Sequence, residues 1–154
     1  MRKAIAIGIT LFGFAALGCP IGPFSGGRLS GDEQTQPADW SFVNDVENCQ
    51  LETNPAEPHS INCWCYGSAG NVYVPSSMIL GPTEPTEREW VQNVQADPDV
   101  RLRVGGKVYA LRAARVEDSA EYGEVLAALE KKYEADPGER EEEREIWLYR
   151  LEAR

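Results

Sequence analysis

The chain is poor in histidine, in methionine and in positive charge. Among its 154 residues are one His and two Met, and 15 Lys and Arg against 25 Asp and Glu give a formal net charge of −10. A single histidine does not support a Ser-His-Asp arrangement. The acidic balance argues against nucleic acid as a partner and against electrostatic adhesion to anionic lipid.

Long apolar runs are also scarce, and the clearest one extends from Ala4 to Leu17. This run is shorter than the roughly 20 residues that a transmembrane helix needs. It follows Arg2 and Lys3 and ends at Gly18-Cys19, without an Ala-x-Ala site. A charged start, a short apolar stretch and a small-residue end are typical of an export signal.

The end of the run, Ala16-Leu17-Gly18-Cys19, resembles a bacterial lipoprotein lipobox. The resemblance implies that residues 1–18 form a cleaved signal peptide and that the Cys19 thiol receives a diacylglycerol. We therefore expect a bacterial cell-envelope protein, lipid-anchored to a membrane on its periplasmic or extracellular face. An ordinary secretory signal cut nearby and a retained N-terminal anchor remain the alternatives.

Three more cysteines follow, Cys49, Cys63 and Cys65. Disulfides persist in the oxidising space outside the cytoplasm. Cys63 and Cys65 are two apart and are expected on one face of a strand, where such neighbours bridge each other poorly. If a bridge forms, we therefore expect Cys49 to pair with one of them, and buried thiols are the alternative. Together with His59, the thiols match no zinc-site spacing, so we expect no metal.

The mature chain divides into a tether and a domain. Residues 19–38 are rich in Pro and Gly and predict a lipidated N-terminus and tether, with a candidate short strand at 27–31. Residues 39–154 predict one domain that is mainly β with two helices, an α+β fold class. It begins with a short helical turn at 39–45, anchored by Trp40 and Phe42. A three-stranded meander is expected next, formed by residues 46–53, 60–66 and 72–74.

Two helices and a hairpin follow this meander. Thr86 and Glu89 form a predicted capping box for a helix that ends near Ala96. The pair Gly105-Gly106 predicts a hairpin over residues 100–116. Asp118 or Ser119 caps a second helix, whose apolar face comprises Tyr122, Val125, Leu126, Leu129 and Tyr133. A last strand at 146–151 suggests a small antiparallel barrel closed by late strands.

Residues 89–113, together with Gly27-Arg28-Leu29-Ser30-Gly31, are similar to the pyridoxamine-5′-phosphate-oxidase-like FMN-binding split barrels. The resemblance is greatest to the deazaflavin-dependent nitroreductase branch, in which a helical Trp and Asn precede a Pro turn and a Gly-Gly hairpin. Here these are Trp90, Asn93, Pro98 and Gly105-Gly106. The resemblance implies a split β-barrel, a homodimer, and FMN or the deazaflavin cofactor F420 in a groove at the dimer interface.

The resemblance also implies where the cofactor lies. It places Ser76 and Ser77 in the loop beside the cofactor's phosphate, and Arg88, Trp90 and Asn93 on the helix beyond. The loop at 75–85 departs from the family pattern because it has no Lys or Arg. The sequence therefore supports two alternative functions. The first is an FMN- or deazaflavin-binding oxidoreductase. The second is a non-catalytic envelope lipoprotein that keeps the barrel, has lost the cofactor and binds another small molecule or a protein.

Other residues carry weaker signals of binding. The predicted hairpin places Arg101, Arg103 and Arg112 on one face, a candidate anion-binding site because guanidinium groups suit phosphate and carboxylate. The alternative is an outer barrel face whose arginines pair with the chain's own acids. Trp64 and Tyr66 are candidates to flank a flavin ring or, alternatively, to pack in the core.

Overall fold

Residues 24–77, 79–135 and 144–154 are described by a computed structural model of the chain. The predicted signal peptide and the predicted lipidation site, Cys19, lie outside the described residues. The described elements are strands, two α-helices and two 3₁₀ helices, in the order β1 (Asp32–Gln34), η1 (Ser41–Asp45), β2 (Cys49–Thr53), β3 (His59–Cys63), β4 (Tyr66–Ser68), β5 (Asn71–Pro75), η2 (Pro85–Glu87), α1 (Glu89–Ala96), β6 (Asp99–Val104), β7 (Lys107–Arg115), α2 (Ser119–Tyr133) and β8 (Leu148–Ala153).

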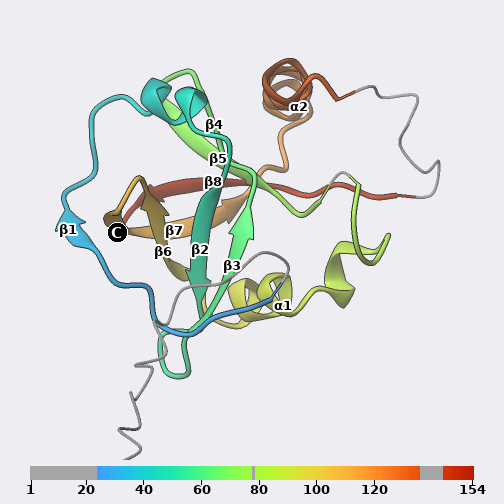
Figure 1. Ribbon diagram of the computed structural model, residues 1–154. Helices are drawn as coiled ribbons and strands as arrows, with labels where there is room; N and C mark the ends of the chain where they lie inside the picture. Colours follow the sequence, from blue (N-terminus) through green and yellow to red (C-terminus); the bar gives the residue numbers. More distant parts are fainter. Residues whose placement is uncertain (1–23, 78, 136–143) are drawn as a thin grey trace, which may run out of the picture.

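The strands form one curled sheet in the order β3-β2-β6-β7-β8-β5-β4, with β1 added beside β7. All neighbours along this path are antiparallel, and only β1 runs parallel to its partner. In Figure 1 the curled sheet has α1 at one end and α2 beside β4 and β8. The predicted fold class, an antiparallel split barrel with two helices, is confirmed.

The predicted three-stranded meander is wrong in its last step. β2 pairs with β3, but the segment predicted as one strand at 60–66 breaks after Cys63, and β4 begins at Tyr66. β5 does not pair with β3: it pairs with β4, where Tyr66 lies opposite Tyr73, and on its other side with β8. Periodicity in the sequence detects extended segments, but it does not tell which distant strand completes each ladder.

Part of the predicted tether packs against the domain. Gly26 exchanges two backbone hydrogen bonds of 2.8 Å with Ser60, and Leu29 is buried. The candidate strand at 27–31 is wrong, since the strand begins at Asp32 and pairs with β7. Residues 24–38 therefore lie on the barrel rather than away from it.

The first helix begins later than predicted. Arg88 is its N-cap residue and makes no side-chain capping bond, while Thr86 belongs to η2. The carboxylate of Glu89 lies 3.5 Å from His59 Nε2 instead of reaching back along the helix. The predicted capping box is therefore wrong, although the buried residues Trp90, Val91 and Val94 are those expected.

Two apolar clusters hold the fold. The first fills the barrel and includes Trp40, Leu51, Leu102 and Leu111. Phe42, expected to anchor the first helical turn with Trp40, is 38% exposed, and Val43 is buried in its place. The second cluster lies between α2 and the sheet and includes Tyr66, Tyr73, Val125, Leu129 and Leu148.

The second helix was predicted correctly at its start. Asp118 is the N-cap and accepts a 2.8 Å hydrogen bond from the Glu121 amide. Its Val125 and Leu129 are buried and its Tyr122, Leu126 and Tyr133 pack against the same cluster. In the described ranges, no helix combines the length and apolar character needed to span a membrane.

Candidate functional site

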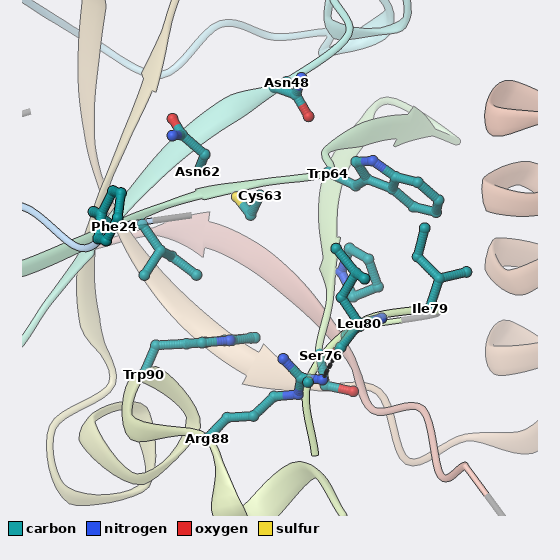
Figure 2. A pocket seen from close by; sticks show the side chains of 14 residues that line it. Phe24, Asn48, Asn62, Cys63, Trp64, Ser76, Ile79, Leu80, Arg88 and Trp90 are labelled. Atoms are coloured by element: carbon teal, nitrogen blue, oxygen red, sulfur yellow. Dashed lines mark hydrogen bonds between the residues drawn. The ribbon is translucent and has the colours of Figure 1, made fainter. Parts of the chain in front are cut away.

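A cavity of about 410 Å³ opens between β3, the end of β5 and the start of α1. This volume lies in the range of small-molecule sites. Its apolar lining consists of Phe24, Ile61, Trp64, Pro75, Ile79, Leu80, Gly81 and Trp90, and its polar lining of Asn48, Asn62, Cys63, Ser76, Ser77 and Arg88. Figure 2 shows Trp64 and Trp90 on different sides of the space, with Cys63 between them. A mostly apolar wall with a few polar groups is typical of a ligand or cofactor pocket.

Ser76 and Ser77 lie in the cavity wall, and their predicted place beside a cofactor phosphate stays a prediction. The Ser76 amide donates to the carbonyl of Trp147 at 2.7 Å, and the Trp147 amide donates to Ser76 Oγ at 3.0 Å. Ser76 therefore prolongs the β5–β8 ladder by one residue. Ser77 Oγ donates to the carbonyl of Leu80 and accepts from its amide. Both hydroxyl groups thus shape the loop that borders the cavity.

Arg88 reaches from the start of α1 into the same wall. Its Nη2 donates to the carbonyl of Leu80 and, at 3.0 Å, to that of Pro82. Arg144 donates to the same two carbonyls and to that of Gly81. Burial and then the neighbouring Arg144 lower the pKa of Arg88 below its ordinary value. Two guanidinium groups therefore converge on one short loop, and Arg88 is held there by neutral carbonyl dipoles.

The other two predicted cofactor-binding residues, Trp90 and Asn93, lie in different surroundings. Trp90 lines the cavity and makes an edge-to-face contact with Tyr149, with ring centroids 5.3 Å apart. Asn93 is not part of the lining, and its Nδ2 donates instead to Thr53 Oγ1 at 3.1 Å. The structure therefore brings Ser76, Ser77, Arg88 and Trp90 together, and it uses Asn93 to join α1 to β2.

The cysteines lie next to the cavity. Cys49 and Cys65 form a disulfide with Cα atoms 5.8 Å apart, which confirms that Cys49 bridges one of the later pair. Cys63 is a free thiol in the cavity wall, and burial raises its pKa to about 12. A thiol with so high a pKa remains protonated and is a poor nucleophile at neutral pH. The expected sharing of one strand face is wrong, because β3 ends at Cys63.

The segment after Cys63 is clamped by the end of α2. Trp64 stacks on Tyr133 with centroids 4.1 Å apart and planes within 6°. Tyr133 Oη accepts from the Cys65 amide at 3.0 Å, and Lys132 Nζ donates to the carbonyls of Cys65 and Val43. Trp64 thereby keeps a fixed place in the cavity wall. Tyr66 is fully buried in the second cluster, so of the two aromatic candidates only Trp64 borders the cavity.

The three hairpin arginines do share one face of β6 and β7, but they contact groups of the chain itself. Arg101 pairs with Glu52 at 2.7 Å and also with Glu33. Arg103 donates to Gln50 at 2.8 Å, and Arg112 lies 3.4 Å from Asp99. These contacts favour the outer-face interpretation, and an anion site on this face stays a prediction.

Sequence reasoning missed several residues of the cavity. Asn48, Asn62 and Phe24 carry no motif, and Phe24 was assigned to the tether. Strand alternation sets Asn62 on the face opposite to Ile61 and Cys63, so the sequence pattern gave no signal for it as a cavity residue. Among the described residues no group of three or more His, Cys, Asp or Glu is arranged to hold a metal ion.

The comparisons with known proteins agree with this architecture. A family model described as F420H(2)-dependent quinone reductase matches residues 63–147, more than half of the chain. That range contains the cavity residues from Cys63 to Trp90. Among curated protein sequences, no relative matches this chain.

Solved structures extend the similarity. A protein described as a domain-swapped dimer is 19% identical, with 69% of this chain and 80% of that chain covered and a TM-score of 0.56. ChuZ of Campylobacter jejuni is 13% identical, with 73% of this chain and 50% of that chain covered and a TM-score of 0.53. At these identities the similarity shows the fold. With the family model, it confirms the resemblance to the pyridoxamine-5′-phosphate-oxidase-like split barrels.

Proposed function

Because the chain belongs to the F420H(2)-dependent quinone reductase family, we propose that it is a reductase that binds deazaflavin in the cavity between β3 and α1. FMN is the alternative cofactor, and a quinone is the electron acceptor. The proposal includes a homodimer in the bacterial cell envelope, held to a membrane by lipid on Cys19. The observation that carries it is the cavity itself, whose lining from Cys63 to Trp90 lies within the family-matched range and presents two indole rings.

The lining supports a planar aromatic ligand. Trp64 is fixed by its stack on Tyr133, and Trp90 by its contact with Tyr149, so neither ring must be ordered when a ligand binds. Asn48 and Asn62 supply amide groups that can hydrogen-bond the edge of a ring system. Preorganised rings with a few polar groups favour a tricyclic cofactor over a flexible ligand.

Arg88 supports an anionic group at one end of the cavity. Its partners among the described residues are two carbonyls, which leave its positive charge unneutralised. A phosphate oxygen can replace a carbonyl as the acceptor and supply the missing negative charge. Arg144, packed on the same loop, adds positive potential at this point. Arg88 therefore fits the phosphate of a flavin or deazaflavin.

When bound, a deazaflavin supplies hydride transfer, and the protein supplies binding, orientation and exclusion of water. In this chain Trp64, Trp90 and Ile61 exclude water from the cavity, and Arg88 orients the anionic end of the ligand. Cys63 remains a neutral thiol in the wall, because its raised pKa keeps it protonated. We assign it no chemical step.

A second function, a lipoprotein that keeps the barrel without the cofactor, is favoured by one observation. The hydroxyl groups of Ser76 and Ser77 are both used within the protein, and the loop at 75–85 contains no basic residue. A cofactor phosphate would therefore depend on Arg88, a residue from outside that loop. The two functions differ in whether the folded protein binds flavin at all.

The deciding experiment is a titration of the mature protein with oxidised deazaflavin cofactor and with FMN, followed by tryptophan quenching. We expect saturable binding, weakened about tenfold or more by Arg88→Met, because charge-assisted hydrogen bonds are lost. Arg112→Met is the matched control and also tests the alternative anion site on the hairpin. Weaker binding by Arg112→Met alone would move the site there, and a folded protein without binding would support the lipoprotein.

The remaining parts of the proposal have separate readouts. Reoxidation of reduced deazaflavin by a water-soluble quinone tests the acceptor. The intact mass of the mature chain tests lipidation of Cys19, and sedimentation in detergent tests the homodimer. Each result stands whether or not the others are positive.

A further inference from the structure

The mouth of the cavity carries an unusual concentration of exposed apolar side chains. Phe24 is 73% exposed, Leu80 is 71% exposed and Ile79 is 57% exposed. In the described part of the chain, only Phe42, at 38%, joins them as an exposed large apolar residue. We refer to Phe24, Ile79 and Leu80 as the apolar rim. Exposed apolar side chains that gather around one opening indicate an interaction surface.

The rim brackets the cavity. In Figure 2 Phe24 lies on one side of the opening, and Ile79 and Leu80 lie on the other, beside Trp64. The two sides come from distant parts of the chain, and each is fixed to the barrel. The segment after Phe24 is bonded to β3 through Gly26 and Ser60. The loop that carries Leu80 is bonded to Arg88 and Arg144.

The rim also lies close to the proposed lipid anchor along the chain. Phe24 follows Cys19 by five residues. Five residues span at most about 18 Å even when fully extended. A lipid on Cys19 therefore cannot hold Phe24, the member of the rim nearest to it in the sequence, farther than this from the membrane surface. The phenyl ring nearest the anchor is also the most exposed member of the rim.

We propose that the apolar rim docks on a lipid bilayer, so that the mouth of the cavity faces the membrane. This inference rests on the proposed lipid anchor. Transfer of exposed Phe, Ile and Leu side chains out of water is favourable, and interfacial apolar groups enter the bilayer boundary by about 5–10 Å. The chain carries a net charge of −10, so the contact is hydrophobic rather than electrostatic.

The test uses the full chain, lipidated in a bacterial host and reconstituted into phosphatidylcholine vesicles with or without bromine-labelled acyl chains. Bromine quenches nearby tryptophan, and Trp64 borders the rim. The signal is the emission lost on replacing Trp64 by Phe, which keeps an aromatic ring to stack on Tyr133. We expect brominated lipid to quench this component, equally at low and high salt.

Matched variants assign the quenching to the rim. Phe24→Ser combined with Leu80→Ser should abolish quenching of Trp64 while the lipid anchor keeps the protein on the vesicle. Phe42→Ser, an exposed apolar change on η1, should leave the quenching unchanged. Circular dichroism of each variant establishes that it is folded before its quenching is compared.

The opposing outcomes are distinct. Unquenched Trp64 in the lipidated protein, or equal quenching in the Phe24→Ser/Leu80→Ser variant, overturns the docking. A dimer that this variant converts to monomer, with Trp64 unquenched in vesicles, assigns the rim to a second copy of the chain instead. If the mature chain carries no lipid mass, the anchor is absent and the docking proposal fails. That result does not affect the cofactor titration that tests the proposed function.

Discussion

Gly67 of β4 lies directly against the backbone carbonyl of Trp40, and a Cβ atom on Gly67 would come within 2.6 Å of that oxygen. Two hydrogen bonds with the Asn44 side chain hold the strand at this distance from η1. Gly67→Ala must therefore displace η1 or the strand. We expect a loss of about 1–3 kcal/mol in the free energy of unfolding, the usual range for overpacking, measured by urea denaturation.

Gly123→Ala is the matched control for that variant. Gly123 is exposed in α2, and a Cβ there meets no atom within 4 Å. Alanine in an exposed helix position is favoured over glycine by roughly 0.5–1 kcal/mol. The same substitution should therefore destabilise at Gly67 and stabilise at Gly123. Equal effects at both positions would contradict the close packing of β4 on η1.

The buried carboxylate of Glu52 is the second point of weakness. Glu52 is 2% exposed, and its Oε2 lies 2.7 Å from Arg101 Nη1 and accepts from the Leu29 amide at 2.6 Å. Glu52→Gln keeps the size of the side chain but removes the negative charge that Arg101 contacts. We expect a loss of about 3 kcal/mol of stability. Asp99→Asn, which removes partly exposed pairs, should cost less than about 1 kcal/mol. Chemical denaturation of both variants in parallel decides the comparison.

The disulfide joins Cys49 and Cys65 across a sequence separation of 16. Closing a loop of this size stabilises a fold by about 3 kcal/mol in the chain-entropy model. A reductant should lower the melting temperature of the protein and of Cys63→Ser, because that variant keeps the bridge. The reductant should have no effect on Cys49→Ser. If Cys63→Ser loses its sensitivity to reductant instead, Cys63 is the bridging residue.

Stability should rise with pH above about 8 because of Lys132. Burial lowers the pKa of Lys132 from 10.5 to about 8. Between these values the unfolded chain binds the proton and the folded chain does not, so stability increases as pH rises through this window. Lys132→Met should remove the increase, and Lys131→Met, an exposed neighbour, should retain it. Melting temperatures between pH 7.5 and 9 test this below the range where the tyrosines titrate. The variants are compared in a Cys63→Ser background, because the raised pKa of the Cys63 thiol lowers stability as pH rises and would oppose the effect of Lys132.

Local signals predicted the hairpin and the second helix well. Gly105 and Gly106 adopt φ angles of 55° and 85°, a backbone that favours glycine, and the register places Arg103 opposite Val108 as expected. Asp118 caps α2 through its own side chain. In both cases the residues that determine the conformation lie within a few positions of it, so the sequence pattern is sufficient.

The start of α1 shows where local signals fail. Thr86 and Glu89 have the spacing of a capping box, yet Glu89 lies beside His59 and Arg88 turns toward the carbonyls of Leu80 and Pro82. Those partners come from β3 and from the loop after β5. A contact between distant segments therefore replaced the local one, and the spacing alone contained no information about it.

The amino-acid sequence was sufficient to predict the class of the domain: an acidic, mainly β domain with two helices and a split-barrel pattern from α1 to β7. Tertiary structure alone decided that β5 completes its ladder with β8 and that Phe24, Cys63, Ser76 and Arg88 border one cavity. Periodicity and turn residues act over a few positions. Strand pairing and cavities depend on which distant segments pack together, and local patterns in a single sequence do not specify those contacts.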